Sequence, residues 1–339
     1  IIIGGIFFGA VQDFGSLFAS IRHKGKSLGE IIELNISHRT KLCFTVFAWL
    51  VLILVVAAFA DIVAGTFAGF DAEGAEVEAN GSVATASMLF IPLAVAFGLF
   101  NRKHDHLLLN TIVGVALLIV CIAVGIYCPI YFSKNLWLVV VFAYIFIASV
   151  APVWILLQPR DYLNSFLLYF MIAAAVIGVV FTNPSMQMEA FTSWSTSGGT
   201  LFPFLFVTVA CGAISGFHSL ISSGTTSKQL NVESDAKMIG YGSMLIECVL
   251  AVVALIAVGS AGMEQWAGMN PPQIFSAGIS AMLGKLGFPQ GTAHTVLLLA
   301  ISAFALTSLD TATRLGRFLF QELFATNKDG SKNILSNMY

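Results

Sequence analysis

Apolar residues are concentrated in nine long runs, and most polar and charged residues lie in the segments between them. An α-helix needs about 20 apolar residues to cross the hydrocarbon core of a membrane, and these runs approach or exceed that length. The pattern predicts an all-α, polytopic membrane protein with a single transmembrane domain over residues 1–339. Residues 262–290 are expected to form an external loop with a short helix. The expected spans are 1–20, 43–70, 84–101, 107–132, 136–157, 162–182, 202–223, 236–260 and 291–324.

Positive charge alternates between successive connections. Fourteen of the 16 Lys and Arg residues lie in every second connection, and only Lys134 and Lys285 lie in the others. Cytoplasmic loops collect Lys and Arg, so this distribution predicts the orientation as well as the number of spans. The connections around Glu76 and Gly198 are expected to face outward. The connections expected to be cytoplasmic are those around Lys24, Arg102, Arg160 and Lys228.

The composition excludes several other classes of protein. Hydrophobic residues make up 58% of the chain and charged residues 10%, whereas a soluble domain has about 25% charged residues. No basic stripe exists outside the short loops, so no nucleic-acid partner is expected. The five cysteines lie in apolar runs without a CxxC pair, which argues against disulfides and zinc. Because no GxSxG, HExxH or P-loop motif occurs, we expect neither an enzyme nor a bound cofactor.

Two polar residues, Gln12 and Asp13, interrupt the first apolar run. An ionised carboxylate facing lipid is costly, so Asp13 is expected to point into the helix bundle. Gly5 and Gly9, four residues apart, give the same helix a small-residue face for close packing. Asp13 is therefore a candidate proton or substrate site together with Gln12. The alternative is a structural hydrogen-bond anchor near the cytoplasmic end of the helix.

A proline lies near the end of the fifth expected span. Pro152 removes a backbone donor and is expected to break or kink the helix near Ala151. Transporters use such broken helices to offer free backbone groups to substrates and ions, so the Pro152 region is a candidate binding site with unpaired carbonyls. Pro-kinked helices without that role are the alternative. Arg160 and Asp161, which follow the span, are interpreted as an interface cap and a gate pair.

The densest group of polar residues lies in the seventh expected span. Ser215, His218, Ser219 and Ser222 are spaced by three and four residues, so they are expected to share one helix face. Hydroxyls and carbonyls can coordinate Na⁺, and a histidine titrates near neutral pH. Polar contacts between helices are the alternative reading. The residues proposed as binding groups here are Ser215, His218, Ser219, Ser222, Ser223, Thr225 and Thr226.

Two further carboxylates lie within apolar runs. Glu247 has no basic neighbour on its own helix and is a candidate proton site. Asp13 or Glu247 is expected to lie near the hydroxyl face. Asp310 is also a candidate binding residue, although Arg314 lies four residues further on and could pair with it along the helix.

Several stretches spread over nearly the whole chain share a further pattern. They are 9–14 (GAVQDF), 25–30 (GKSLGE), 152–154 (PVW), 159–163 (PRDYL), 201–204 (LFPF), 215–218 (SGFH), 222–226 (SSGTT), 239–242 (IGYG) and 309–314 (LDTATR). These stretches resemble the carbon starvation protein A (CstA) family. That family's Gly-Pro-rich segment before the first helix and its last helices are missing here, and the chain begins without Met. The chain is therefore expected to be a fragment of the whole protein.

The resemblance implies a multi-pass transporter of the bacterial cytoplasmic (inner) membrane that carries peptides or pyruvate during carbon starvation. It also implies kinship with the amino acid–polyamine–organocation superfamily, whose leucine-transporter-like fold is an inverted-repeat helical bundle with broken helices. On that analogy, 136–157 is a broken helix and 202–223 supplies hydroxyls to a sodium site. A Na⁺ ion at Ser215 and Ser219 is one candidate arrangement, and no other metal is expected.

The expected function is alternating-access import coupled to H⁺ or Na⁺. We favour H⁺ because a titratable group, His218, lies inside the hydroxyl cluster. The alternative from another class is a membrane-embedded nutrient sensor that binds the same ligand without transporting it. A channel is a third reading, and it would show neither saturation nor dependence on a coupling gradient.

Overall fold

The computed structural model describes residues 1–71, 73–101, 107–191, 193–196, 199–261, 263–266 and 268–324. Arg102 and Gly198, two positions of the expected topology, lie outside these residues. The described chain is almost entirely helical, and its one sheet is a short antiparallel pair, β1 (Ser195–Thr196) and β2 (Gly199–Thr200). An all-α chain is expected in a membrane because a helix satisfies its own backbone hydrogen bonds.

The first helical stretch consists of α1 (Ile2–Gly4), a π-helical turn η1 (Gly5–Gly9) and α2 (Ala10–Arg22). The interrupted stretch after β2 consists of η2 (Leu201–Leu205), α9 (Phe206–Thr208), η3 (Ala210–Gly212), α10 (Gly216–Gly224) and η4 (Thr226–Lys228). The remaining helices are α3 (Leu28–Asn35), α4 (His38–Phe67), α5 (Glu78–Asn101), α6 (Leu107–Tyr127), α7 (Lys134–Val150), α8 (Leu157–Thr182), α11 (Asp235–Gly259), η5 (Met263–Trp266), α12 (Pro271–Lys285) and α13 (Gln290–Phe324).

Within the described residues, seven helices are long and apolar enough to cross a membrane. They are Ile2–Arg22, His38–Phe67, Glu78–Asn101, Leu108–Tyr127, Leu157–Thr182, Asp235–Gly259 and Gln290–Phe324. Large apolar side chains such as Phe47, Leu54 and Phe146 are exposed on these helices and on α7. Exposed apolar surface of this kind is what a lipid-facing helix presents, so the protein is an all-α, multi-pass membrane protein.

Two of the nine expected spans are interrupted. The helix expected over 136–157 ends at Val150, Ala151 takes an extended conformation, and α8 begins at Leu157. The predicted break at Pro152 is therefore confirmed, because proline cannot continue the helix. The continuous helix expected over 202–223 is wrong. Its backbone leaves the α conformation between Val209 and Ser215, so only α10 is a regular helix there.

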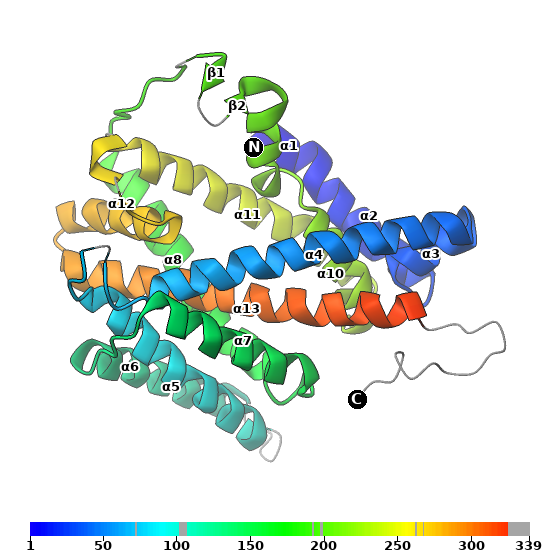
Figure 1. Cartoon of the computed structure of the whole chain (residues 1–339), viewed down its shortest axis with the longest axis horizontal. Coiled ribbons are helices and arrows are strands. Elements are labelled where there is room, and N and C mark those ends of the chain that lie inside the picture. Colours follow the sequence, from blue (N-terminus) through cyan, green and yellow to red (C-terminus); the bar gives the residue numbers. More distant parts are fainter. Residues whose placement is uncertain are drawn as a thin grey trace. The chain divides into compact units, whose positions relative to one another are not determined.

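The described chain forms two compact units. Unit 1 comprises Ile1–Leu50, Met186–Gly259 and the end of α13 from Phe318, and unit 2 comprises Val51–Ser185 and Ser260–Arg317. In unit 1, α2 packs against both α10 and α11. In unit 2, α5 and α6 lie side by side (Figure 1), and α8 contacts α5, α6 and α12. The core of unit 2 includes Phe67 and Trp137, whose rings meet edge to face with centroids 5.1 Å apart.

A polar corner lies at the end of unit 1 where the chain turns after α2. Ser27 and Glu30 form a capping box that begins α3. Lys41 at the start of α4 contacts Glu33 at 2.6 Å and lies 3.8 Å from Glu322 at the end of α13. Hydrogen bonds from Lys41 and then His38 lower the pKa of the Glu33 carboxyl group. These contacts hold α3, α4 and α13 together at this corner.

The contacts inside each unit agree with the alternation of charge that predicts the topology. In unit 1, Arg22 pairs with Glu233 at 3.0 Å, so two connections expected to be cytoplasmic lie together. In unit 2, Asp61 lies near the end of α4 that precedes an expected external connection, and it pairs at 2.7 Å with Lys134, which lies in the next expected external connection. Arg160 was expected to lie in a connection between two helices. That expectation is wrong, because Arg160 lies inside α8 and is buried.

A cysteine-labelling experiment tests this orientation. Single cysteines at Lys24 and Lys228 are expected to resist a membrane-impermeant maleimide in intact cells, whereas a cysteine at Glu76 is expected to react. All three are expected to react after the membrane is permeabilised, which is the control for accessibility. Strong labelling at Lys228 in intact cells would reverse the orientation.

Candidate functional site

A histidine lies between two carboxylates in unit 1. The Nδ1 atom of His218 lies 2.9 Å from Oδ2 of Asp13, and its Nε2 atom lies 2.9 Å from Oε2 of Glu247. The three residues come from α10, α2 and α11, so three segments far apart in the sequence meet at one imidazole. Asp13 is buried, and the side chains of His218 and Glu247 are each 29% exposed.

The two contacts of His218 depend on how many protons the cluster holds. A neutral imidazole has one N–H donor, whereas an imidazolium has two. Both ring nitrogens of His218 face a carboxylate oxygen, so both contacts are hydrogen bonds only when the cluster holds one proton beyond its fully deprotonated form. Loss of that proton would place a nitrogen lone pair against a carboxylate. Protonation and the contacts between α10, α2 and α11 are therefore linked.

Small residues let the three segments approach one another. A Cβ atom on Gly9 would overlap the carbonyl oxygen of Ala213, and one on Gly5 would overlap the sulfur of Cys248. The predicted packing face of the first helix is therefore confirmed. Asp13 lies four residues after Gly9 and so shares its side of the helix. Both glycines belong to the π-helical turn η1, a backbone form that is frequent at functional sites.

Hydroxyl groups next to this cluster take part in contacts between helices. Gln12 donates a hydrogen bond from Nε2 to Oγ of Ser219 at 2.5 Å. Ser223 donates to the carbonyl oxygen of Ser219, and Ser20 donates to the carbonyl oxygen of Ser223, both at 3.0 Å. Ser222 is buried beside them. Within the described residues, no group of three or more His, Cys, Asp or Glu is arranged to hold a metal ion.

A second buried charge cluster lies in unit 2. Arg160 on α8 donates hydrogen bonds from Nη1 to the Tyr144 hydroxyl and to Oδ2 of Asp310. The Tyr144 hydroxyl donates to the same Asp310 oxygen at 2.7 Å. The side chain of Arg160 is 1% exposed and that of Asp310 is 0% exposed. Arg160 and Asp310 therefore form a fully buried ion pair. Oδ1 of Asp161 lies 3.6 Å from Nη2 of Arg160.

This cluster corrects two expectations from the sequence. The alternative to a binding role for Asp310 is pairing with Arg314 along the helix, but Asp310 accepts hydrogen bonds from Arg160 and Tyr144. Arg314 instead donates from Nη2 to the carbonyl oxygens of Ala148 and Ala151, at 2.5 Å each. The expectation of unpaired carbonyls at the break is therefore wrong for these two groups. A guanidinium at a helix C-terminus satisfies orphan carbonyls and opposes the negative end of the helix dipole.

Removing this cap has a measurable consequence. Replacement of Arg314 by Leu is expected to leave two part-buried carbonyls without a donor, at a cost of up to about 1–3 kcal/mol each. Residues 151–156 should then exchange their amide hydrogens faster, as measured by hydrogen–deuterium exchange of the protein in detergent. The matched control is Arg317→Leu, three residues further along α13. Equal exchange at 151–156 in the two variants would show that Arg314 does not hold the break.

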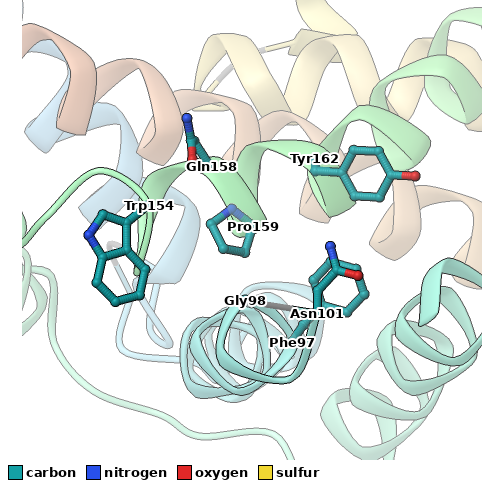
Figure 2. Close-up of a pocket in the computed structure, with 7 residues that line it drawn as sticks. All are labelled: Phe97, Gly98, Asn101, Trp154, Gln158, Pro159 and Tyr162. Carbon is teal, nitrogen blue, oxygen red and sulfur yellow. The ribbon is translucent and has the colours of Figure 1, made fainter. Parts of the chain in front are cut away.

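One cavity lies beside this break. It has a volume of about 520 Å³ and lies between the end of α5 and the start of α8. Figure 2 shows Phe97, Gly98 and Asn101 of α5 on one side and Trp154, Gln158, Pro159 and Tyr162 on the other. Its lining residues carry no charge, so it offers no ionic partner to a charged ligand. Sequence reasoning missed these residues, since aromatic and amide side chains carry no specific spacing signal.

Nearly the whole chain matches one known protein family. The family model for carbon starvation protein CstA matches residues 1–276 and 267–338. The chain belongs to the carbon starvation protein CstA family. No solved structure matches the chain, so the leucine-transporter-like arrangement stays a prediction.

Individual relatives carry transporter names. "Peptide transporter CstA" of Helicobacter pylori is 37% identical over 299 residues, which cover 81% of this chain and 41% of that protein. "Peptide transporter CstA" of Bacillus subtilis is 30% identical over 371 residues, covering 96% of this chain and 60% of that protein. "Pyruvate/proton symporter BtsT" of Escherichia coli is 35% identical over 287 residues, covering 80% of this chain and 39% of that protein. The chain thus spans 39% to 60% of the length of these relatives.

The candidate residues of this CstA-family chain fall into two groups. Gln12, Asp13, Ser215, His218, Ser219 and Glu247 come together in unit 1. Thr225 and Thr226 belong to the same unit and follow the end of α10. Pro152, Arg160, Asp161 and Asp310 belong to unit 2. The prediction that Asp13 or Glu247 lies near the hydroxyl face is confirmed for both, since each contacts His218.

Proposed function

We propose that the protein is a proton-coupled secondary transporter that imports peptides or pyruvate across the bacterial cytoplasmic membrane by alternating access. Membership in the CstA family supports transport, because the relatives are named as peptide transporters and as a pyruvate/proton symporter. The multi-pass helical architecture also supports a moving bundle, because one helix ends at Val150, just before Pro152, and a second is interrupted between Val209 and Ser215. The inverted-repeat fold is part of this proposal.

The observation that carries proton coupling is the placement of His218 between Asp13 and Glu247. With the extra proton bound, the imidazolium joins α10 to α2 on one side and to α11 on the other. Without it, one of the two contacts becomes repulsive, so the three segments favour a different arrangement. A proton taken up on one side of the membrane and released on the other would then drive the alternation. A Na⁺ ion held by the hydroxyls of Ser215 and Ser219 would share the Ser219 oxygen with the hydrogen bond from Gln12.

Counterflow distinguishes a carrier from a sensor and from a channel. The purified protein is reconstituted into vesicles loaded with unlabelled substrate and then exposed to a trace of labelled substrate. A carrier is expected to accumulate label transiently inside the vesicles, in parallel arms with pyruvate and with a dipeptide. A sensor would bind the label without exchanging it, and a channel would only equilibrate it. Either of those two results would reject the transport proposal.

A further inference from the structure

The buried ion pair of unit 2 leaves part of its guanidinium unused. Arg160 bonds to Tyr144 and Asp310 through Nη1 alone, and within the described residues its Nε and Nη2 atoms have no hydrogen-bond partner. Asp161 forms a long ion pair with Nη2, since 3.6 Å is too far for a good hydrogen bond. Within the described residues, Oδ1 of Asp161 and Oδ1 of Asp310 are likewise without a hydrogen-bond partner. A guanidinium that is 1% exposed has no access to bulk water. Its unpaired N–H groups are costly unless something else satisfies them.

Two more unpaired polar atoms border the same small cavity. Arg160 lines a cavity together with Ser87 of α5 and Asn164 of α8, the latter one turn after Arg160 on the same helix face. Within the described part of the chain, Oγ of Ser87 and Oδ1 of Asn164 also have no hydrogen-bond partner, and both residues are more than nine-tenths buried. The other walls of the cavity are mostly apolar, and include Phe90, Leu118, Leu167, Leu299 and Leu306.

The chemistry of these groups selects a ligand class. The Nε–H and Nη2–H groups of a guanidinium point in parallel and match the two oxygens of a carboxylate. The Ser87 hydroxyl can donate to a neighbouring carbonyl oxygen, and the Asn164 side-chain oxygen can accept from an N–H group. The apolar walls suit a methyl group or a small side chain. Pyruvate and the C-terminal end of a short peptide share this combination of a carboxylate beside a carbonyl and an apolar group.

We propose that Arg160, with Ser87 and Asn164, forms the site that binds the carboxylate of the transported substrate. This assignment rests on the proposed function and names the group of the substrate that is recognised. In this structure the cavity has a volume of about 10 Å³, which holds roughly one water molecule. A carboxylate is larger than this volume, so it enters when the helices around the cavity move apart.

Paired ligands that differ only in the carboxylate test the site. Binding to the purified complete protein is measured by titration calorimetry for pyruvate against pyruvamide, and for dialanine against dialanine amide. The wild-type protein is expected to bind at least one of the two acids about tenfold or more tightly than its amide. The arm that shows this preference identifies pyruvate or a peptide as the source of the carboxylate. Equal binding of acid and amide in both arms would overturn the proposal.

Substitutions then connect the preference to the cavity. Arg160→Lys keeps the charge but loses the planar fork, so the acid-to-amide preference is expected to fall about tenfold. A preference within twofold of wild type would overturn the assignment of Arg160.

A pair of serine substitutions gives the same answer if Arg160→Lys fails to fold. Ser87→Asp places a carboxylate in the cavity, where it would compete for Arg160. Ser133→Asp adds the same group at the N-cap of α7, outside the cavity, where aspartate also caps a helix. Ser87→Asp is expected to lose the preference for the acid, and Ser133→Asp is expected to keep it. If Ser87→Asp keeps the preference as Ser133→Asp does, the cavity does not bind the carboxylate and the proposal is wrong.

Failure of this site and failure of transport give different results. If the wild-type protein shows counterflow but Arg160→Lys keeps its acid preference, transport stands and this site is rejected. If the acid preference depends on Arg160 and Ser87 but no counterflow occurs, the site stands and the protein binds its ligand as a sensor does.

Discussion

Replacement of His218 by Gln abolishes accumulation of substrate driven by a pH gradient, if the proposed coupling is correct. Glutamine keeps a hydrogen-bond donor and an acceptor between Asp13 and Glu247 but cannot take up a proton near neutral pH. The variant is expected to retain counterflow, because exchange of substrate needs no net proton movement. Its accumulation ratio under an imposed inward proton gradient should fall to the equilibrium value of 1, as measured with labelled substrate in proteoliposomes.

The matched control is His23→Gln. His23 follows α2, and its Nδ1 atom contacts the carbonyl oxygen of Ala19, away from both carboxylates. This variant is expected to accumulate substrate as wild type does, which shows that losing a histidine is not in itself harmful. Wild-type accumulation by the His218→Gln protein would mean that His218 has a structural role only, and that another group carries the proton.

Replacement of Asp310 by Ala has the largest expected effect on stability. Asp310 is 0% exposed and balances the charge of Arg160, which is 1% exposed. Removing Asp310 leaves the buried Arg160 with only the longer contact to Asp161, at 3.6 Å, and breaking a buried pair in this way costs about 3–5 kcal/mol. The substitution also removes the acceptor for the Tyr144 hydroxyl. The free energy of unfolding in mixed micelles, measured by titration with a denaturing detergent, is expected to fall by that amount.

An exposed ion pair in the same unit provides the control. Asp61 and Lys134 are 2.7 Å apart, but their side chains are 62% and 43% exposed. Because solvent screens such a pair, Asp61→Ala is expected to cost less than about 1 kcal/mol. Equal losses of stability in the Asp310→Ala and Asp61→Ala variants would contradict the description of Arg160 and Asp310 as a buried, mutually dependent pair.

The sequence predicts much of the helical architecture because its signals are local. Runs of apolar residues mark the long helices, and Pro152 marks the end of α7 because it removes a donor from its own helix. Gly5 and Gly9 predict that another helix packs closely against the first one. They do not predict that Cys248 and Ala213 are the residues in contact there. The helical spacing of Ser215, His218, Ser219 and Ser222 predicts one shared helix face. Ser219 and Ser222 are buried on α10, but Ser215 precedes that helix with an extended backbone, so the prediction is wrong for Ser215.

What the sequence misses depends on contacts between distant segments. Arg160 and Asp310 are 150 positions apart, and nothing in the residues around either one indicates the other. The nearer partner, Arg314, is the one that local spacing favours. The interruption between Val209 and Ser215 is also hidden, because Ala210, Cys211 and Gly212 contain no proline and fit an apolar run. In the structure, α11 and the first helix pack against this segment, where the backbone is irregular.

Uptake by the purified protein, with proton and sodium gradients imposed separately, tests the central claim most directly. In sealed proteoliposomes, an inward proton gradient is expected to drive labelled pyruvate or peptide above its external concentration. A protonophore should abolish that accumulation, and a sodium gradient alone should have no effect. Accumulation that follows the sodium gradient and is indifferent to the proton gradient would contradict the account, as would simple equilibration under both gradients.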